Sequence, residues 1–498
     1  MSFGQQLPLG QRIPESIHAV SVSIPTLKDV VGYEERDPAT MAHLKSGYPR
    51  FVKHEYLVKI EERWKTFFDR PNHSIWLTSS EAVARELEDH LSHPKTKYLA
   101  NGGISGLSYP ENSDLDRQAK HYLQHTGGHL STRHAEDYLF SQNLIQARYP
   151  EESYEGDAQA KVLQHLAPLY NLSSPENIAL AYTGMSSFYA AFRAINEVQI
   201  AKGRISWIKL GWLYTDTMHI LEKLSPDNHD NINLYNVLDL DQLEAILESR
   251  PNDFAGLITE CPTNPLLHTA DLSRIRSLAT KYGFYLLLDP TLNSPANVDV
   301  SPYADIITNS LTKYASNQGD VIIGATAVLD RCPDKESILK KIRQYTEPPY
   351  PRDLSRLAAQ IDGYPSLIEK VNVTTREVVD FLDSHPAVKE VFWAYGSCSK
   401  SQYKEIERSP DSIGGVISFE LQGDMQTFHD RVRIPKGPSF GIHTSLICPF
   451  IWLAHYDLIA SENGREYLKK AGIPKDLIRF AIGSEPAEEI IAALSEAL

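Results

Sequence analysis

A lysine that follows an apolar strand pattern is the residue best placed to do chemistry in this chain. Lys313 comes shortly after the run Ala304–Ser310, and the hydroxyls of Ser310 and Thr312 precede it. An amine that forms a Schiff base must lie near a carbonyl group and be partly desolvated, which lowers its pKa. Neighbouring hydroxyls can donate to a phosphate. A lone lysine at a strand end is more often a solvated surface residue, so the prediction depends on what gathers around it.

Two other apolar runs end in residues that suit the same ligand. Gly184 ends the run Asn177–Gly184, and a glycine there lets backbone amides at a helix N-terminus approach a phosphate. Asp289 ends the run Phe284–Pro290, where it could hold the proton of a pyridine nitrogen or simply cap a turn. Open α/β sheets bind ligands at the carboxyl ends of their strands. Together with Lys313, these positions predict pyridoxal 5′-phosphate (PLP) and an enzyme that acts on an amino acid.

The elements that must position these residues alternate between strands and helices. Apolar strand patterns are followed by amphipathic helical patterns, and such alternation predicts an α/β domain with a mostly parallel sheet. The expected strands cover residues 177–184, 204–210, 254–260, 284–290, 304–310 and 320–329. The expected helices cover residues 185–201, 240–250 and 272–283.

The segments on either side of this region have different patterns. Residues 1–150 show weak periodicity, and their clearest element is a helix over Ser79–Leu91, so they are interpreted as an N-terminal extension and arm. Residues 151–349 are expected to form the large PLP-binding domain. Residues 350–498 are expected to form a smaller α+β domain, with a strand over Gly414–Leu421 and helices over Met425–Val432 and Glu485–Leu498. A proline-rich linker, Thr346–Leu354, separates the two domains.

Bulk properties exclude several classes of protein. The 498 residues are 42% hydrophobic and 23% charged, and the net charge of −15 argues against a nucleic-acid partner. Four widely spaced cysteines, no leader pattern and no apolar run of roughly 20 residues favour a cytoplasmic protein without a membrane partner. The histidine-rich segment His125–His134 is interpreted as a polar loop, and no metal site is predicted.

Four motifs carry a resemblance to a known family. They are TGM (Thr183–Met185), ECPTNP (Glu260–Pro265), SLTK (Ser310–Lys313) and LIRFAIGSE (Leu477–Glu485). With them, the chain resembles the cystathionine γ-synthase/γ-lyase family, whose members are fold-type-I PLP-dependent enzymes of sulfur amino-acid metabolism. Segments near both ends, such as LICPFIWLAHYDL, are similar to the long-chain fungal cystathionine γ-synthases, so the resemblance extends over nearly the whole chain.

The resemblance implies a role for each matching residue. Lys313 would form the Schiff base with PLP and then move protons on the substrate, and Asp289 would bind the pyridine nitrogen. Asn264 would bind the 3-hydroxyl oxygen, and Tyr214 would stack on the ring as a residue that also takes part in catalysis. The other cofactor contacts, most of them to the phosphate, would come from Gly184, Met185, Thr291, Ser310 and Thr312.

Substrate binding and assembly are implied in the same way. Arg479 would clamp the α-carboxylate of the substrate, with help from Ser445. Family members form homodimers or homotetramers with shared active sites, and Arg148 would reach the phosphate of the neighbouring subunit.

The chain departs from the family's pattern at several positions near the site. The family's Y-G-G-T becomes Tyr214–Thr217, in which Asp216 replaces the second glycine. Pro290 replaces the asparagine that follows the key aspartate, and Gln146 replaces the tyrosine of the Y-x-R motif. Thr444 stands where relatives often carry a glutamate. These positions predict an altered substrate pocket.

The activity implied by the resemblance is a γ-replacement of the transsulfuration route to methionine. An O-acylated homoserine would lose its acyloxy group from Cγ, and cysteine would add there to give cystathionine. A different nucleophile, such as a carbon nucleophile of a specialised pathway, is one alternative, and γ-lyase activity is another. A non-catalytic scaffold is the alternative from a different class.

Overall fold

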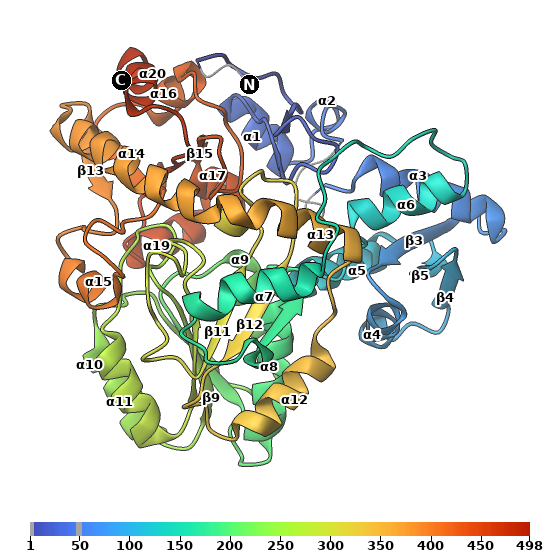
Figure 1. The fold of residues 1–498 in the computed structure, drawn as a ribbon, viewed down its shortest axis with the longest axis horizontal. Helices are drawn as coiled ribbons and strands as arrows, with labels where there is room; N and C mark the ends of the chain where they lie inside the picture. The colour runs from blue at the N-terminus through green and yellow to red at the C-terminus, as the bar shows by residue number, and fades with distance from the viewer. Residues whose placement is uncertain (1–3, 46–51) are drawn as a thin grey trace.

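A seven-stranded sheet forms the centre of the structure, a computed structural model that describes residues 4–45 and 52–498 (Figure 1). Strand β12 is antiparallel to both of its neighbours, and all the other adjacent strands run parallel. The predicted α/β class with a mostly parallel sheet is therefore confirmed. Across the sheet the order is β6 (Ile178–Ala181), β12 (Gly324–Val328), β11 (Ile306–Ser310), β10 (Tyr285–Asp289), β9 (Phe254–Glu260), β7 (Ser206–Leu210) and β8 (Ile232–Leu234).

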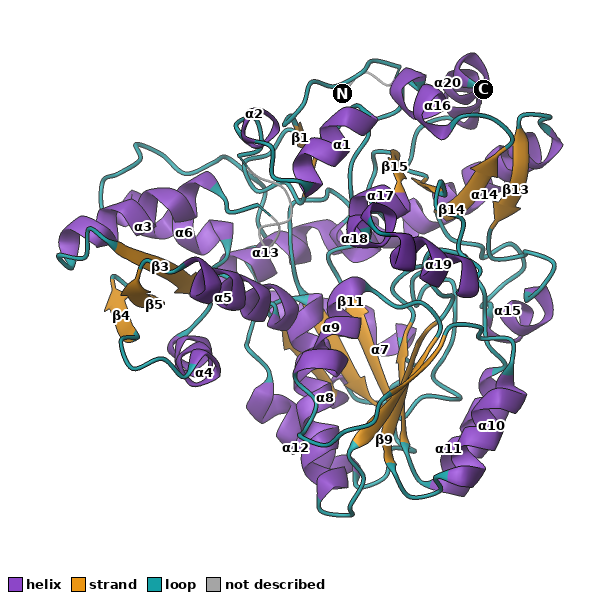
Figure 2. Cartoon of the chain, turned by 180° about the vertical axis from the view of Figure 1, so that it is seen from behind, coloured by secondary structure: helices purple, strands orange, loops and turns teal. Residues whose placement is uncertain are grey.

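Helices cover both faces of this sheet, because its strands are apolar on both sides (Figure 2). In β10, Tyr285 and Leu287 point to one face, whereas Leu286 and Leu288 point to the other. The first face packs against α8 (Gly184–Ile200), α9 (Thr215–Lys223) and α12 (Lys335–Tyr345). The second packs against α7 (Ala158–Leu169), α10 (Leu240–Ser249), α11 (Leu272–Tyr282) and α13 (Pro351–Gln360).

Local signals account for the helix boundaries. Helix α11 begins after Asp271, whose side chain accepts a hydrogen bond from Arg274 N, and it ends at Gly283 in the left-handed conformation (φ +73°). Leu272, Ile275 and the other apolar residues of its inner face are buried. The predicted helix over residues 272–283 is thus confirmed, with the glycine as its C-terminal cap.

A second, four-stranded antiparallel sheet belongs to the C-terminal part of the chain. Its core also includes Val22, Val30 and other apolar residues near the N-terminus, such as those of α1 (Leu27–Glu34). No helix among residues 4–45 and 52–498 is long and apolar enough to cross a membrane. The strands of this four-stranded C-terminal sheet are, in spatial order, β13 (Val388–Phe392), β14 (Val416–Leu421), β16 (Ile478–Ala481) and β15 (Leu446–Pro449). Helices α14 (Tyr364–Ser384), α16 (Met425–Arg431) and α20 (Ala487–Ala497) cover this sheet.

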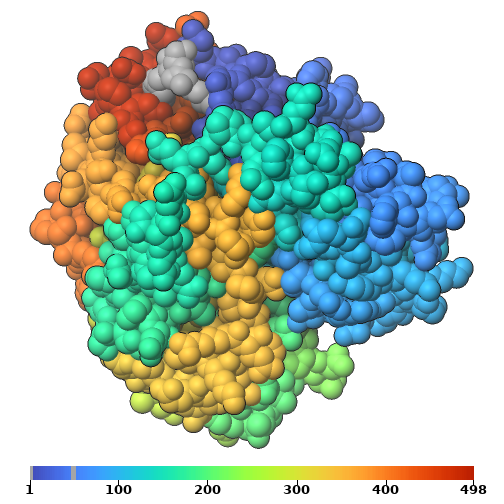
Figure 3. All heavy atoms as spheres, turned by 45° about the vertical axis from the view of Figure 1, so that its right-hand side comes forward, coloured from blue at the N-terminus to red at the C-terminus, as the bar shows by residue number. Residues whose placement is uncertain are grey.

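Residues 55–141 form a separate three-layer unit, here called the N-terminal module, which projects as a blue lobe in Figure 3. A three-stranded antiparallel sheet lies between two pairs of helices. The strands are β3 (His73–Thr78), β5 (Ile104–Pro110) and β4 (Lys97–Asn101). One pair of helices is α3 (Glu55–Phe67) and α6 (Thr132–Ser141), and the other is α4 (Glu81–Leu91) and α5 (Ser113–Thr126).

Two sequence-based expectations for this region need correction. The helix predicted over Ser79–Leu91 is present as α4, but the three strands were not predicted, because central strand β5 is covered on both faces and shows no clear alternation. The segment His125–His134 is not simply a polar loop. His125 lies in the buried last turn of α5, and His134 lies within α6.

Candidate active site

The sheet topology brings the predicted strand-end residues to one edge. Strands β7, β9, β10 and β11 are parallel neighbours, so their carboxyl ends lie together. Strand β6 points the same way, because it and β11 are both antiparallel to β12. Asp289 is the last residue of β10, and the residues that come after the other four strands are Tyr214, Asn264, Lys313 and Gly184.

Lys313 lies in the turn after β11 and is largely shielded from solvent. It is 8% exposed, and its Nζ donates a hydrogen bond to Ser439 Oγ at 3.0 Å. The same ammonium lies 4.7 Å from the centroid of the Phe440 ring. Contacts from the C-terminal part of the chain therefore hold the amine in place, and it is shielded from bulk water as a Schiff-base lysine must be.

Arg479 is a buried cation next to the same serine. It lies on β16, is 8% exposed, and donates long hydrogen bonds of 3.4 Å to the Ser439 carbonyl oxygen and to Asn264 Oδ1. Its guanidinium also lies 4.6 Å from the centroid of the Phe450 ring. No carboxylate of the described residues forms an ion pair with it, although buried charges are normally paired. An arginine in this state is suited to bind the carboxylate of a ligand.

The sequence analysis did not identify Ser439. Its hydroxyl contacts Lys313, its carbonyl group contacts Arg479, and its backbone adopts a left-handed conformation (φ +89°) that is uncommon for serine. Ser445, to which the substrate role was given, is fully buried. Its hydroxyl donates to Glu485 Oε2 at 2.7 Å and accepts a hydrogen bond from Gly483 N. In the structure, the serine that joins the two cations is thus Ser439.

Asp289 is partly buried at the end of β10. Its Oδ1 accepts a hydrogen bond of 2.8 Å from Thr291 N, but burial dominates and raises the pKa of its carboxyl group to about 6. Thr291 also links two strand ends, because its Oγ1 accepts hydrogen bonds from Ser310 N and Asn309 Nδ2. A cationic ring nitrogen beside Asp289 would oppose the effect of burial and favour the carboxylate form.

The Glu260 side chain forms hydrogen bonds with both the turn after β9 and the turn after β7. One carboxylate oxygen accepts a hydrogen bond of 2.6 Å from Tyr214 N, and the other accepts one of 3.2 Å from Asn264 N. Burial, with the nearby charge of Asp289, raises the pKa of Glu260 well above its usual value. The sequence analysis quoted Glu260 within a motif and gave it no role, because its two acceptor contacts arise only when the two turns meet.

Helix α8 begins at the turn that is predicted to bind the phosphate of PLP. Thr183 caps the helix, and Gly184 is its first residue, so the first backbone N–H groups have no partners within the helix. A Cβ at Gly184 would lie 2.8 Å from the Ser310 Cβ, so only glycine permits this close approach. Met185 and Thr312 are buried next to this turn, and the Thr312 hydroxyl accepts a hydrogen bond from Ile323 N at 3.3 Å.

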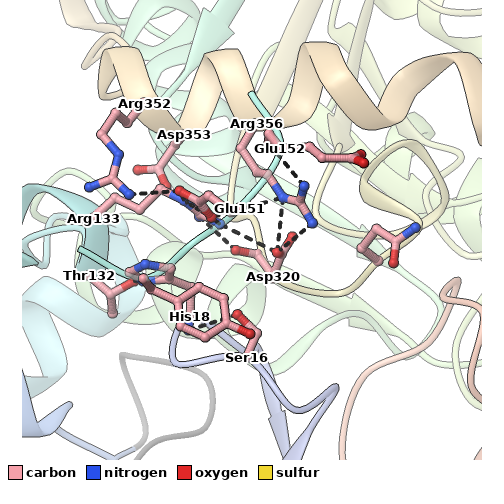
Figure 4. A network of polar contacts seen from close by, with 12 residues as sticks. Ser16, His18, Thr132, Arg133, Glu151, Glu152, Asp320, Arg352, Asp353 and Arg356 are labelled. Carbon is pink, nitrogen blue, oxygen red and sulfur yellow. Dashed lines mark hydrogen bonds and ion pairs between the residues drawn. The ribbon is translucent and has the colours of Figure 1, made fainter. Parts of the chain in front are cut away.

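A buried ion network joins Arg133 of the N-terminal module to Asp320 and Asp353 (Figure 4). Arg133 of α6 is 1% exposed and pairs with Glu151 at 2.7 Å and Asp353 at 2.9 Å. It also donates to the Asp320 carbonyl oxygen at 2.7 Å. Asp320 begins the segment that leads to Ile323, which contacts Thr312. A cavity beside the network reaches Thr183 at the start of α8.

Positions that depart from the family pattern have different surroundings. Asp216 is fully buried and hydrogen-bonded to α5, and Pro290 is buried after β10. Thr444 is partly buried, close to the buried turn that holds Ser445. Gln146 and Arg148 are exposed on the N-terminal side, where Arg148 pairs with Asp137 and lies over the Phe140 ring. Among the described residues, Arg148 therefore has no contact with the candidate site residues of its own chain.

Comparison with known proteins places this arrangement in a family. Residues 153–498 match the family model described as Cys/Met metabolism PLP-dependent enzyme. The chain is 34% identical over 485 residues to L-2-amino-4-chloropent-4-enoate dechlorinase/desaturase of Streptantibioticus cattleyicolor, and the alignment covers 97% of both chains. It is 27% identical to cystathionine gamma-synthase of Neurospora crassa, with 98% of both chains covered.

Solved structures support the same fold. The crystal structure of cystathionine gamma-lyase from Lactobacillus plantarum complexed with L-serine covers 71% of this chain, and 88% of that chain is matched. The TM-score is 0.58 at 23% identity, a level that shows the fold alone. The resemblance that the sequence motifs carried is confirmed, as is the fold-type-I architecture.

The described residues fit PLP. The first turn of α8 offers unpaired backbone N–H groups to a phosphate, beside a glycine that the approach of Ser310 requires. Asp289 could offer a carboxylate to the ring nitrogen, and Lys313 a shielded amine to the aldehyde. Arg479 remains available for the α-carboxylate of an amino acid.

Replacing Gly184 should weaken PLP binding. In Gly184→Ala, the new methyl group would meet Ser310 at 2.8 Å and push the first turn of α8 away from β11. Overpacking of this kind costs about 1–3 kcal/mol, so we expect the dissociation constant for PLP to rise about tenfold or more in absorbance titrations of the apoprotein. Gly423→Ala is the matched control, because no atom lies within 4 Å of its added Cβ. Equal affinities for all three proteins would contradict this assignment.

PLP affinity should also depend on the ionisation of Asp289. With a pKa of about 6, the carboxyl group of the apoprotein is neutral below that pH and ionised above it. Only the ionised form pairs with a protonated ring nitrogen, so affinity should increase as the pH is raised from about 5 to about 7. In Asp289→Asn we expect weaker binding, by about tenfold or more, and the loss of this contribution to the pH dependence. A variant whose affinity and pH profile match the unmodified protein would exclude this role.

Proposed function

Because the chain belongs to the family of Cys/Met metabolism PLP-dependent enzymes, we propose that it removes a leaving group from Cγ of an amino acid and replaces it. The favoured reaction joins an O-acylated homoserine and cysteine into cystathionine, with release of the carboxylic acid. One observation carries this proposal: Ser439 contacts both the amine of Lys313 and the guanidinium of Arg479, which has no carboxylate partner among the described residues. A substrate held by its carboxylate at Arg479 would therefore present its Cα near Lys313.

The residues of the chain divide the work between binding and proton transfer. Arg479 binds the α-carboxylate and fixes the orientation of the amino acid. Bound PLP supplies an electron sink that stabilises negative charge at Cα after its proton leaves. The Lys313 amine removes the proton from Cα and would pass it to C4′ of bound PLP, so that the amine is free to remove a proton from Cβ, whose loss expels the γ substituent from the substrate. After cysteine sulfur has added at Cγ, the same amine returns protons to Cβ and Cα.

Two buried carboxylates organise this chemistry. Asp289 would pair with the ring nitrogen of bound PLP and favour its protonated form. Glu260 accepts hydrogen bonds from Tyr214 N and Asn264 N, so the residue proposed to stack on the ring and the residue proposed to bind its 3-hydroxyl oxygen move as one unit. Such preorganisation limits the rearrangement needed when the substrate enters.

A γ-elimination without an added nucleophile is the second candidate. Aromatic rings of Phe440 and Phe450 lie against the two cations, and Thr444 stands where relatives often carry a glutamate. An apolar wall suits a small uncharged γ substituent, such as a halogen. The relative from Streptantibioticus cattleyicolor is named for loss of chlorine from an amino acid with chlorine at its fourth carbon. Loss of a group from Cγ is common to both candidates, as it is to replacement by a carbon nucleophile.

Product analysis separates these candidates. The purified holoenzyme would be incubated with O-acetylhomoserine, O-succinylhomoserine or L-2-amino-4-chloropent-4-enoate, each with and without cysteine. We expect cystathionine from an acylated homoserine only when cysteine is present. Release of chloride without cysteine dependence would favour elimination, and the absence of cystathionine with both acyl donors would overturn the favoured reaction. Arg479→Ala is the variant control, and it should raise KM much more than the solvent-exposed replacement Arg117→Ala.

The enzyme is also proposed to work as a homodimer or as a homotetramer made of two such dimers, in which Arg148 serves the neighbouring site. Its exposure and its distance in sequence from the strand-end residues suit a contact between subunits. Lys313→Ala and Arg148→Ala should each lower activity. Co-expressed together, the two variants form mixed dimers with one complete site, so activity should exceed that of either variant alone. No gain in the mixture would place Arg148 outside the active site.

A further inference from the structure

The last turn of α5 lies between two turns of the proposed cofactor site. Helix α5 belongs to the N-terminal module, and it packs on both α8 and α9 of the large sheet (Figure 2). It ends at Gly127, which adopts the left-handed conformation with φ +74°. Helix α8 begins at the proposed phosphate site, and α9 begins directly after Tyr214. One helix end from outside the central sheet therefore contacts both sides of the site.

The contact with α9 is made through a buried carboxylate. Asp216 is fully buried, and its Oδ1 accepts hydrogen bonds of 3.0 Å from Gln124 Nε2 and from His125 Nδ1. Two residues earlier, Tyr214 N donates to Glu260 Oε1 at 2.6 Å. The turn that carries Tyr214 is thus held by the sheet at one end and by α5 at the other. Relatives with glycine in place of Asp216 lack this side chain.

Charged neighbours define which nitrogen of His125 carries its proton. Lys223 Nζ lies 3.4 Å from His125 Nε2, so this nitrogen accepts and Nδ1 donates to Asp216. The rings of His219 and His121 lie 4.7 Å and 5.7 Å from the His125 ring. Glu222 pairs with His219 and with Lys209 on the outer side. Burial lowers the pKa of His125, although Asp216 acts in the opposite direction.

The contact with α8 is a close approach of backbone to side chain. A Cβ at Gly127 would lie 1.9 Å from Thr183 Oγ1, the atom that caps α8 by accepting from Ser186 N. Any side chain at Gly127 would therefore displace the cap that precedes Gly184. The left-handed glycine has two uses here, since it ends α5 and makes room for Thr183.

We propose that His125 is a positioning residue, which acts through Asp216 to hold Tyr214 against the face of the cofactor ring. The N-terminal module thereby contributes to the active site without contacting the substrate. This role depends on the cofactor site and not on which amino acid the enzyme accepts, so it stands or falls separately from the proposed reaction.

Three variants test the role in the holoenzyme without substrate. His125→Leu removes the donor to Asp216, His125→Asn keeps a side-chain N–H group near the position of Nδ1, and His121→Leu replaces a histidine one turn earlier in the same helix. The first measurement is the visible circular dichroism of bound PLP, which reports the tilt and environment of its ring. The second is the dissociation constant for PLP.

For His125→Leu we expect an altered dichroism spectrum and about tenfold weaker PLP binding, the effect of losing one hydrogen bond to a charged group. His125→Asn should retain most of the original spectrum and affinity, and His121→Leu should match the unmodified protein. If His125→Leu does not fold, Gln124→Ala removes a second donor to Asp216 from a half-buried position and should shift both readouts in the same direction. Unchanged spectra and affinities in the folded variants would overturn the proposal.

Discussion

The direction of neighbouring strands is the constraint on which the site depends. Strands β7, β9, β10 and β11 run parallel, and in β9 and β10 the register sets Glu260 opposite Asp289. A crossover connection, which contains a helix except between β10 and β11, returns the chain to the same starting edge each time, so each of these strands delivers its next residue to one side of the sheet. The antiparallel strand β12 does not disturb this pattern, because β6 beyond it again points the same way. The carboxylate, amine and phosphate positions follow from this one arrangement.

This arrangement costs free energy, because it removes charged groups from water. Lys313, Asp289, Glu260 and Arg479 are all removed from most of the solvent, and burial raises the pKa of both carboxyl groups. Hydrogen bonds offset part of this cost at Glu260, and aromatic rings cover the two cations. Among the described residues, Arg479 has no carboxylate partner, and the Asp289 carboxylate accepts hydrogen bonds from Thr291 alone. A cofactor and an amino acid would satisfy these remaining groups.

Much of this site was predictable because its residues end regular elements. Lys313, Asp289 and Gly184 each follow an apolar run whose length and pattern identify a strand, and the strand rule then places them together. Ser439 could not be found in this way. It lies outside helices and strands, and the C-terminal part of the chain brings it to Lys313 through packing that no local pattern encodes. The link from His125 to Asp216 is hidden for the same reason, since the two residues are 91 positions apart.

The N-terminal module was also hidden, because strand β5 is covered by helices on both faces and lacks the alternation of a half-exposed strand. The central claim nonetheless concerns a single amine. Borohydride reduction of the PLP-loaded protein, followed by peptide mapping with mass spectrometry, identifies the residue that carries the cofactor. We expect the reduced cofactor on the peptide that contains Lys313, and on no other peptide. Label on a different lysine, or no label on a protein that binds PLP, would contradict the account.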